Sequence, residues 1–289
     1  MTITLQADEP ERKPLFRRVL QAFIDVRELT LIVLIAAIII VMANVSPYFL
    51  SFSNFRAVAV GMAPTAVIVI GMAILLASGG FDLSVGSVMA LSSTVVAMLL
   101  LAGLPIPVAV ICGLLLGAVV GVVNGLLVTG LGINPLIATL GTMSIARGIA
   151  LVLTEGFSVS SLPAAFGWIG KADLGGFPVI VIVTILLVVV FDLAVRHTRF
   201  FRQVYFIGAN EKAAMLSGIN VNRVRIIAYA LTGVLAAFAG VLLASRLMSG
   251  TPTAGNGLEL QVLAAAVIGG GFAPLIAVAL IVGAMMARR

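Results

Sequence analysis

Long apolar runs recur along the chain and are separated by short polar or glycine-rich connections. A hydrocarbon core of about 30 Å needs about 20 helical residues to cross it. Runs near that length lie at 29–45, 57–77, 83–102, 106–130, 135–153, 177–195 and 226–246. A last apolar stretch, 260–287, is interrupted by Gly269, Gly270, Gly271 and Pro274. The pattern predicts an all-α, polytopic transmembrane helical bundle of about eight spans.

No long polar domain separates these runs, so we predict one transmembrane domain over 29–287. Strands are not expected, because open sheet edges are not tolerated in lipid. Residues 1–28 carry charges of both signs up to Glu28 and lack a small-residue cleavage site, which is not the pattern of a cleavable signal peptide. We predict that they form a cytoplasmic N-terminal segment.

Composition supports the membrane assignment. Hydrophobic residues make up 62% of the chain and charged residues 10%, against about 45–50% and about 25% in ordinary globular domains. The surplus apolar surface must face lipid, which disfavours a soluble enzyme and a disordered protein. Cys112 is the sole cysteine, so a disulfide scaffold is disfavoured as well.

The distribution of positive charge predicts the orientation. The net charge is +6, but Lys and Arg gather in the N-terminal segment and in the 196–225 loop, unlike a basic nucleic-acid-binding face. Loops rich in Lys and Arg stay in the cytoplasm. The N-terminus and the 196–225 loop are therefore predicted to be cytoplasmic, and the 154–176 loop to be the main loop on the outside.

Glycines recur at every fourth position across one span, at Gly113, Gly117, Gly121 and Gly125. This spacing places them on one helix face, where a neighbouring helix can approach closely. Static packing and a helix that slides against its neighbour both agree with the pattern.

Polar residues inside apolar runs are candidate site residues, because burying them in a membrane is expensive. Asp82 follows a glycine-rich break, which predicts a discontinuous helix near 78–87 with Asp82 at the start of its second half. It can cap that helix, line a pathway, or do both. Arg147 lies within the 135–153 run, where its side chain can either reach outward to the membrane surface or face a polar cavity. Neutral hydrogen-bonding groups on this helix and the one before it suit an uncharged polyhydroxylated solute better than an ion: Asn124, Asn134, Thr139, Thr142 and Ser144.

The 196–225 loop carries apolar residues as well as arginines. Asn210 is expected to cap a short helix over 211–217 that Gly218 ends. Small and apolar residues on a short cytoplasmic helix favour docking into a groove of a soluble partner over an ordinary solvated loop.

Several catalytic signatures do not occur in the sequence. No G-x-x-x-x-G-K-[ST] motif is present, so if transport is driven by ATP, the nucleotide site is on another chain. No residue set predicts a metal, a cofactor or a catalytic centre. Only Asp82 and Glu259 are candidate intramembrane carboxylates, fewer than many proton-coupled carriers need.

Four motifs follow one another along the chain: 81–87 (FDLSVGS), 134–148 (NPLIATLGTM to ARG), 208–219 (GANE to SGI) and 252–270 (PTAG, then GLEL, then AAAVIGG). Together they resemble the permease subunits of bacterial ABC sugar importers of the ribose, xylose and arabinose type. The resemblance covers roughly residues 29–270.

The resemblance implies a dimeric pore in the inner membrane, served by cytoplasmic ATPase subunits and a periplasmic sugar-binding protein. The residues it places in the ATPase-coupling region are Gly208, Asn210, Glu211, Ala214, Ser217, Gly218 and Ile219. Those it places in the translocation half are Asp82, Asn134, Thr139, Arg147 and Glu259. The family has about ten spans and continues through two more after the position of Gly270, whereas this chain stops at Arg289.

Two other functions remain open at this point. An ion-gradient-driven secondary carrier would need no ATPase, and broken helices at 78–87 and 267–274 would suit it. A member of the same importer family could also take a small polar ligand other than a sugar.

Overall fold

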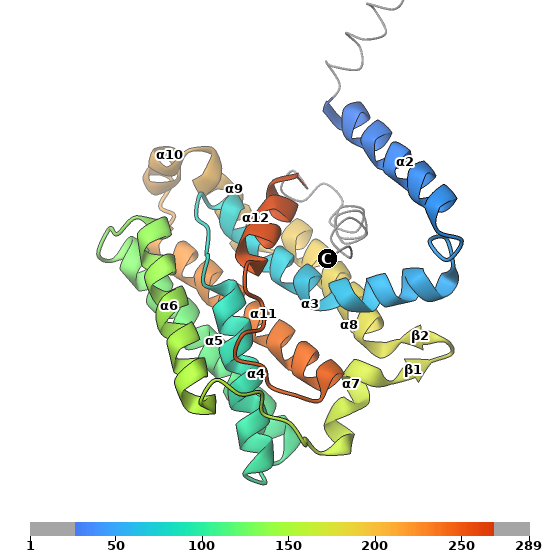
Figure 1. Ribbon diagram of the computed structural model, residues 1–289. Coiled ribbons are helices and arrows are strands. Elements are labelled where there is room, and N and C mark those ends of the chain that lie inside the picture. The colour runs from blue at the N-terminus through green and yellow to red at the C-terminus, as the bar shows by residue number, and fades with distance from the viewer. Residues whose placement is uncertain (1–26, 269–289) are drawn as a thin grey trace, which may run out of the picture. The chain divides into compact units, whose positions relative to one another are not determined.

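The computed structural model describes residues 27–268 (Figure 1). The predictions made for residues 1–26 and for residues 269–287 lie outside that part of the chain. Two compact units are present, Met1–Phe55 and Arg56–Arg289. In the first, α2 (Arg27–Val45) is followed by a turn in which Asn54 Nδ2 donates to the Phe49 carbonyl oxygen (2.8 Å).

The described residues of the second unit, 56–268, are almost entirely helical. Its elements are the continuation of α3 (Phe52–Ala77), α4 (Val85–Leu101), α5 (Ile106–Thr129), α6 (Pro135–Thr154), η1 (Ala164–Gly167), α7 (Trp168–Lys171), β1 (Asp173–Leu174), β2 (Phe177–Pro178), α8 (Val179–His197), α9 (Arg199–Ala209), α10 (Glu211–Leu216), α11 (Val221–Leu247) and α12 (Leu258–Ile268). Five helices, α3, α5, α6, α8 and α11, are long and apolar enough to cross a membrane, and α4 and the described parts of α2 and α12 are shorter apolar helices. The predicted all-α polytopic bundle is confirmed.

The predicted spans agree with the helices to within about five residues at each end. The break predicted near 78–87 is a non-helical segment, 78–84, between α3 and α4. The short helices η1, α7 and α9 and the β1–β2 hairpin were not predicted, because each is shorter than the apolar runs that signal a span.

Helix α11 lies at the centre of the second unit, and its neighbours approach it backbone to backbone. A Cβ atom on Gly117 of α5 would lie 2.3 Å from the Gly233 carbonyl oxygen, and one on Gly233 would lie 2.1 Å from that of Gly117. On its other sides, a Cβ on Gly240 would lie 2.3 Å from the Met89 carbonyl oxygen of α4, and Thr232 Oγ1 donates to the Gly71 carbonyl oxygen of α3 (3.0 Å).

The four-residue glycine stripe of α5 lies at these close approaches. Gly117, Gly121 and Gly125 face α11, while Gly113 faces Val96 and Ser92 of α4. The opposite side of α5 is exposed in the isolated chain and consists of large apolar residues: Val108, Ile111, Leu115, Val119, Val123 and Leu126. Within residues 27–268, the packed side of α5 is therefore the side that carries the glycines.

Candidate functional site

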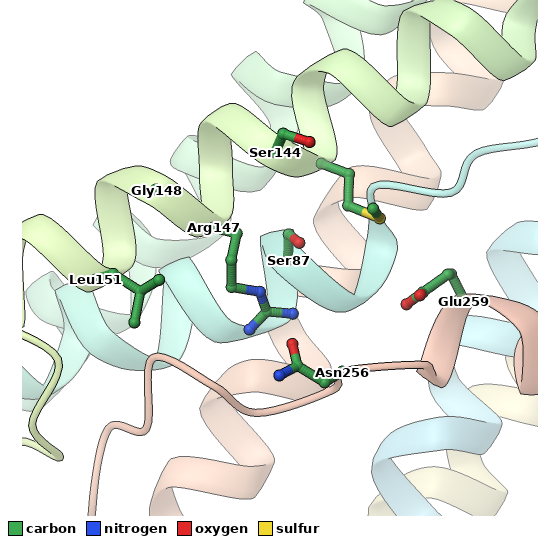
Figure 2. A pocket seen from close by; sticks show the side chains of 8 residues that line it. Ser87, Ser144, Arg147, Gly148, Leu151, Asn256 and Glu259 are labelled. Carbon is green, nitrogen blue, oxygen red and sulfur yellow. The ribbon is translucent and has the colours of Figure 1, made fainter.

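A cavity of about 370 Å³ opens between α4, α6 and the start of α12. Five of its eight lining residues carry polar or charged side chains; the lining consists of Ser87, Met143, Ser144, Arg147, Gly148, Leu151, Asn256 and Glu259. Figure 2 shows Arg147 reaching from α6 toward Ser87 and Asn256, with the Glu259 side chain directed into the same space. The volume is at the lower end of the range for small-molecule sites, about 300–1,000 Å³.

The cavity exists because the chain turns back along α4 after α11. Met248 ends α11 in the left-handed conformation, at φ 53°. A Cβ on Gly250 would lie 2.7 Å from the carbonyl oxygen of Ser93 in α4. A Cβ on Gly86, in the first turn of α4, would lie 2.4 Å from the carbonyl oxygen of Gly255. The 248–257 segment thus runs against α4 back to its first turn, and this brings Asn256 and Glu259 opposite Ser87.

Arg147 holds this re-entrant segment in place. Its Nη1 donates to the carbonyl oxygens of Pro252 (2.6 Å) and Ala254 (2.7 Å). Non-helical backbone at membrane depth is tolerated only where protein groups satisfy it or where it lines a cavity. Arg147 satisfies two carbonyls of this kind, and the nearby carboxylate of Glu259 attracts its guanidinium group.

The lining offers both kinds of hydrogen-bonding group. The guanidinium of Arg147 donates, the carboxylate of Glu259 accepts, and Ser87, Ser144 and Asn256 do both. The hydroxyl groups of a polyol also donate and accept, so the arrangement fits a small polyhydroxylated molecule. Among residues 27–268, no group of three His, Cys, Asp or Glu residues is placed to hold a metal ion.

Asp82 belongs to a buried network beside the break and is not part of the cavity lining. Its Oδ1 accepts from the backbone N (2.8 Å) and the Oγ (2.6 Å) of Ser84, and its Oδ2 accepts from Asn124 Nδ2 (3.2 Å). Asn124 Oδ1 in turn accepts from Thr142 Oγ1 (2.6 Å). Asp82 therefore holds the turn before α4 and connects it, through Asn124 of α5, to α6.

Two further predicted pathway residues bond within their own helix. Asn134 is exposed and caps α6, where its Oδ1 accepts from the Leu136 backbone N (2.9 Å). Thr139 is buried and its Oγ1 donates to the Pro135 carbonyl oxygen (2.7 Å). Of the five predicted pathway residues, the structure brings only Arg147 and Glu259 together in the cavity.

A second hollow, of about 740 Å³, lies where α9, α10 and the segment after α10 meet. We call it the α9–α10 groove; it is lined by Arg199, Arg202, Gln203, Phe206, Ala209, Asn210, Ala213, Ala214, Ser217 and Ile219. The predicted short helix is confirmed as α10. Asn210 Oδ1 caps it by accepting from the Ala213 backbone N (3.0 Å), and Gly218 follows in the left-handed conformation at φ 81°.

The predicted coupling residues divide into three groups. Asn210, Ala214, Ser217 and Ile219 line the groove, and the neighbouring Leu216 is 91% exposed at the tip of α10. Gly208 faces the other way: a Cβ there would lie 2.0 Å from the Ala77 carbonyl oxygen, so α9 packs against the end of α3. Glu211 pairs with Arg225 of α11, and Gly218 ends α10.

Arg225 joins three parts of the chain. Its Nη1 and Nη2 donate to the two carboxylate oxygens of Glu211 (3.1 and 2.7 Å), and its Nε donates to the Ser78 carbonyl oxygen (3.2 Å). Its side chain is 19% exposed. A single guanidinium group thus ties α10 to the 78–84 break that contains Asp82.

Sequence reasoning did not identify several residues that the structure places at these sites. In the cavity these are Ser87 and Asn256, and the available signal for Asn256 was its position between Gly255 and Gly257. The residues of α9 that line the α9–α10 groove were also missed. The available signal for helix α9 was the helical spacing of Phe201, Val204 and Ile207, which are its buried residues.

Comparison with known proteins agrees with this architecture. The model of the family described as "Branched-chain amino acid transport system / permease component" matches residues 54–287. The ribose import permease protein RbsC of Bacillus subtilis (strain 168) is 40% identical over 81% of this chain and 73% of its own length. The L-arabinose permease AraH and the D-allose permease AlsC of Escherichia coli (strain K12) are 38% and 37% identical over 83% and 82% of this chain, each over 73% of its own length. No solved structure matches.

Proposed function

The chain belongs to the permease-component family of branched-chain amino acid transport systems, and from that premise we propose that it is the membrane-spanning subunit of an ATP-driven importer for a monosaccharide or a related small polyol. The observation that carries the proposal is the cavity between Arg147 and Glu259, whose donors and acceptors fit hydroxyl groups. The similar permeases named for ribose, L-arabinose and D-allose support the choice of a sugar.

The importer would need three kinds of partner. An ABC ATPase subunit would bind at the α9–α10 groove and drive the opening of the pore, since this chain carries no nucleotide-binding motif. A periplasmic sugar-binding protein would deliver the substrate, and a second permease copy or paralogue would complete the pore. On this proposal the chain lies in the bacterial inner membrane with its N-terminus and the 196–225 loop in the cytoplasm, and 29–287 form one permease domain.

Two measurements test the proposal. Affinity purification of the tagged chain in mild detergent should recover an ATP-binding cassette protein in near one-to-one ratio. Uptake of labelled ribose, arabinose and allose should continue when an uncoupler is added at constant ATP. A chain that purifies alone and stops transporting with the uncoupler would instead be an ion-gradient-driven carrier.

A non-sugar substrate is the second candidate, because the family description names branched-chain amino acids. An amino acid brings a separate ammonium and a carboxylate, and the cavity offers one cationic and one anionic side chain, Arg147 and Glu259. Competition of labelled sugar uptake by leucine or valine distinguishes the two substrates: competition supports the amino acid, and its absence supports the sugar.

We expect Glu259→Gln to lower sugar uptake without loss of the folded permease. Glutamine keeps the size of the side chain but replaces a charged acceptor, and a hydrogen bond to a charged group contributes about 1.5–3 kcal/mol. A loss of about tenfold corresponds to about 1.4 kcal/mol. The measurement is the initial rate of uptake at several sugar concentrations, normalised to permease in the membrane.

The matched variant for Glu259→Gln is Ser144→Ala, which removes one neutral hydroxyl from the same cavity and should have the smaller effect. If Glu259→Gln transports at the wild-type rate at every concentration, the cavity is not on the substrate pathway.

We expect Gly218→Arg to leave membrane insertion intact and to separate ATP hydrolysis from uptake. The space around Gly218 is open, with no atom within 4 Å of a Cβ placed there, so the fold is not disrupted by contact. A long charged side chain at that position would obstruct a protein bound in the groove. Gly218→Ala is the matched control for Gly218→Arg. Both side chains meet the same positive φ, so both cause a backbone strain of about 1–2 kcal/mol, but alanine adds no bulk in front of the groove.

The measurement is ATPase rate and sugar uptake in vesicles that contain the complete complex. Gly218→Ala should keep most of the uptake that Gly218→Arg loses. Equal uptake by both variants would remove the groove from the coupling interface.

A further inference from the structure

Three large apolar side chains are exposed near the start of α8 and take part in neither the cavity nor the groove. Trp168 of α7 is 59% exposed, and Leu174 and Phe177 of the hairpin are 55% and 60% exposed. Leu174 lies directly opposite Phe177 in the β1–β2 register. Directly paired residues of an antiparallel hairpin project from the same face, so Leu174 and Phe177 form one apolar surface.

This surface is held by contacts on both sides. Arg56 of α3 forms an ion pair with Asp173, and the Val179 backbone N donates to the Ala172 carbonyl oxygen (2.9 Å). On the other side, the Gly170 backbone N donates to Ser245 Oγ of α11 (2.9 Å). The hairpin and α7 are therefore fixed beside the ends of three helices, α3, α8 and α11, as Figure 1 shows for α7 and α8.

Covalent continuity with α8 sets the depth of this surface in the membrane. Helix α8 has 19 residues, and at 1.5 Å per residue it is about 28 Å long, close to the hydrocarbon thickness of about 30 Å. Its first residue, Val179, therefore lies near the edge of the hydrocarbon core. Phe177 is two residues away, and two residues reach at most about 7 Å. The headgroup layer on each side is about 5–7 Å deep, so Phe177 cannot leave it.

The charges nearby agree with such a location. Asp173 is neutralised by Arg56, whereas Lys171 is an exposed cation on the last turn of α7. Tryptophan is enriched at membrane interfaces because its apolar ring and polar N–H suit the headgroup level, and lysine can reach from there to lipid phosphates.

We propose that α7 and the β1–β2 hairpin form an interfacial anchor that inserts Trp168, Leu174 and Phe177 among the lipid headgroups at the outer end of α8. The occupant of this surface is lipid rather than a soluble partner. The proposal depends on the chain spanning a membrane and is independent of what the permease transports.

Trp168 is the only tryptophan of the chain and reports directly on its surroundings. The full-length permease, purified without partner chains, is placed in nanodiscs of phosphatidylcholine brominated near the headgroup, brominated near the end of the acyl chain, or unbrominated. We expect loss of Trp168 fluorescence mainly with bromine near the headgroup, an emission maximum shifted to the blue of free tryptophan, and little quenching by aqueous iodide.

A second variant places the reporter in water. Trp168→Phe with Leu216→Trp moves the tryptophan to the tip of α10, where iodide should quench it and brominated lipid should not. A third variant, Trp168→Phe with Phe177→Trp, should repeat the result of Trp168 if the hairpin lies in the same layer. The proposal is overturned if Trp168 is quenched by iodide and by neither brominated lipid, which is the result for a water-facing surface. Protection from all quenchers would also overturn it, since another copy of the chain would then cover the surface.

Discussion

Replacing Gly121 with alanine is expected to prevent α5 from packing against α11 and to reduce sharply the amount of folded permease. A Cβ there would lie 2.3 Å from the Tyr229 carbonyl oxygen and 2.7 Å from the Cα of Ala230. Both are backbone atoms of the central helix, so no side-chain rotation relieves the contact. Forcing an extra carbon into a packed core costs about 1–3 kcal/mol, and we expect the upper end of that range. The measurement is thermal stability in detergent, followed by size-exclusion chromatography.

Gly141→Ala is the matched control for Gly121→Ala. Gly141 lies in the neighbouring span α6, and a Cβ on it has no atom within 4 Å. It should therefore melt at about the wild-type temperature. If the two alanine variants are equally stable, α5 and α11 do not meet backbone to backbone, and the central packing described above is wrong.

Arg225→Gln is expected to reduce sugar uptake by about tenfold or more, while the complex assembles and continues to hydrolyse ATP. The guanidinium pair with Glu211 is bidentate, and charge-assisted bonds of this geometry are among the strongest in proteins. Glutamine cannot hold both carboxylate oxygens and the Ser78 carbonyl together. Movement of α10 would then no longer reach the 78–84 break, whose Asp82 connects through Asn124 to α6 and hence to the helix that carries Arg147.

Arg223→Gln is the matched control, since it removes the same charge two residues away at an exposed position. It should leave uptake unchanged. Glu211→Gln should repeat the defect of Arg225→Gln, because it breaks the same pair from the other side. Wild-type uptake with Arg225→Gln would show that the pair has no part in transmission. Equal losses in Arg223→Gln and Arg225→Gln would show that total charge matters and the pair does not.

The spans were predictable because each depends on local sequence alone. A helix in lipid satisfies its backbone polar groups internally, so about 20 apolar residues in a row are enough to indicate one. Helices α5 and α6 accordingly begin and end within one residue of the predicted spans. The glycine stripe of α5 was predictable for the same reason, since four-residue spacing fixes a helix face wherever the helix lies.

The cavity was predictable only in part. Arg147 and Glu259 were identified because charges in apolar runs stand out, but their proximity depends on the path of the 248–257 segment along α4. That path is set by the close approach of Gly250 and Gly255 to α4. A glycine in the sequence permits such a close approach, but it does not indicate which helix is approached.

By itself the sequence determined the membrane location, the helical class, the positions of the spans, the break before α4 and the short capped helix at 211–216, because local hydrophobicity and capping chemistry act within a few residues. The tertiary structure alone decided that Asp82 bonds in a buried network, that Arg147 reaches the carbonyls of Pro252 and Ala254, and that Arg225 pairs with Glu211. The Asp82–Asn124 and Arg147 contacts join residues between 42 and 107 positions apart, and the hydrogen bond from Arg225 to Ser78 spans 147. No local pattern specifies contacts over such separations, since they follow from the way that α4 and α5 pack with α11 and that α6 packs with α4 and α5.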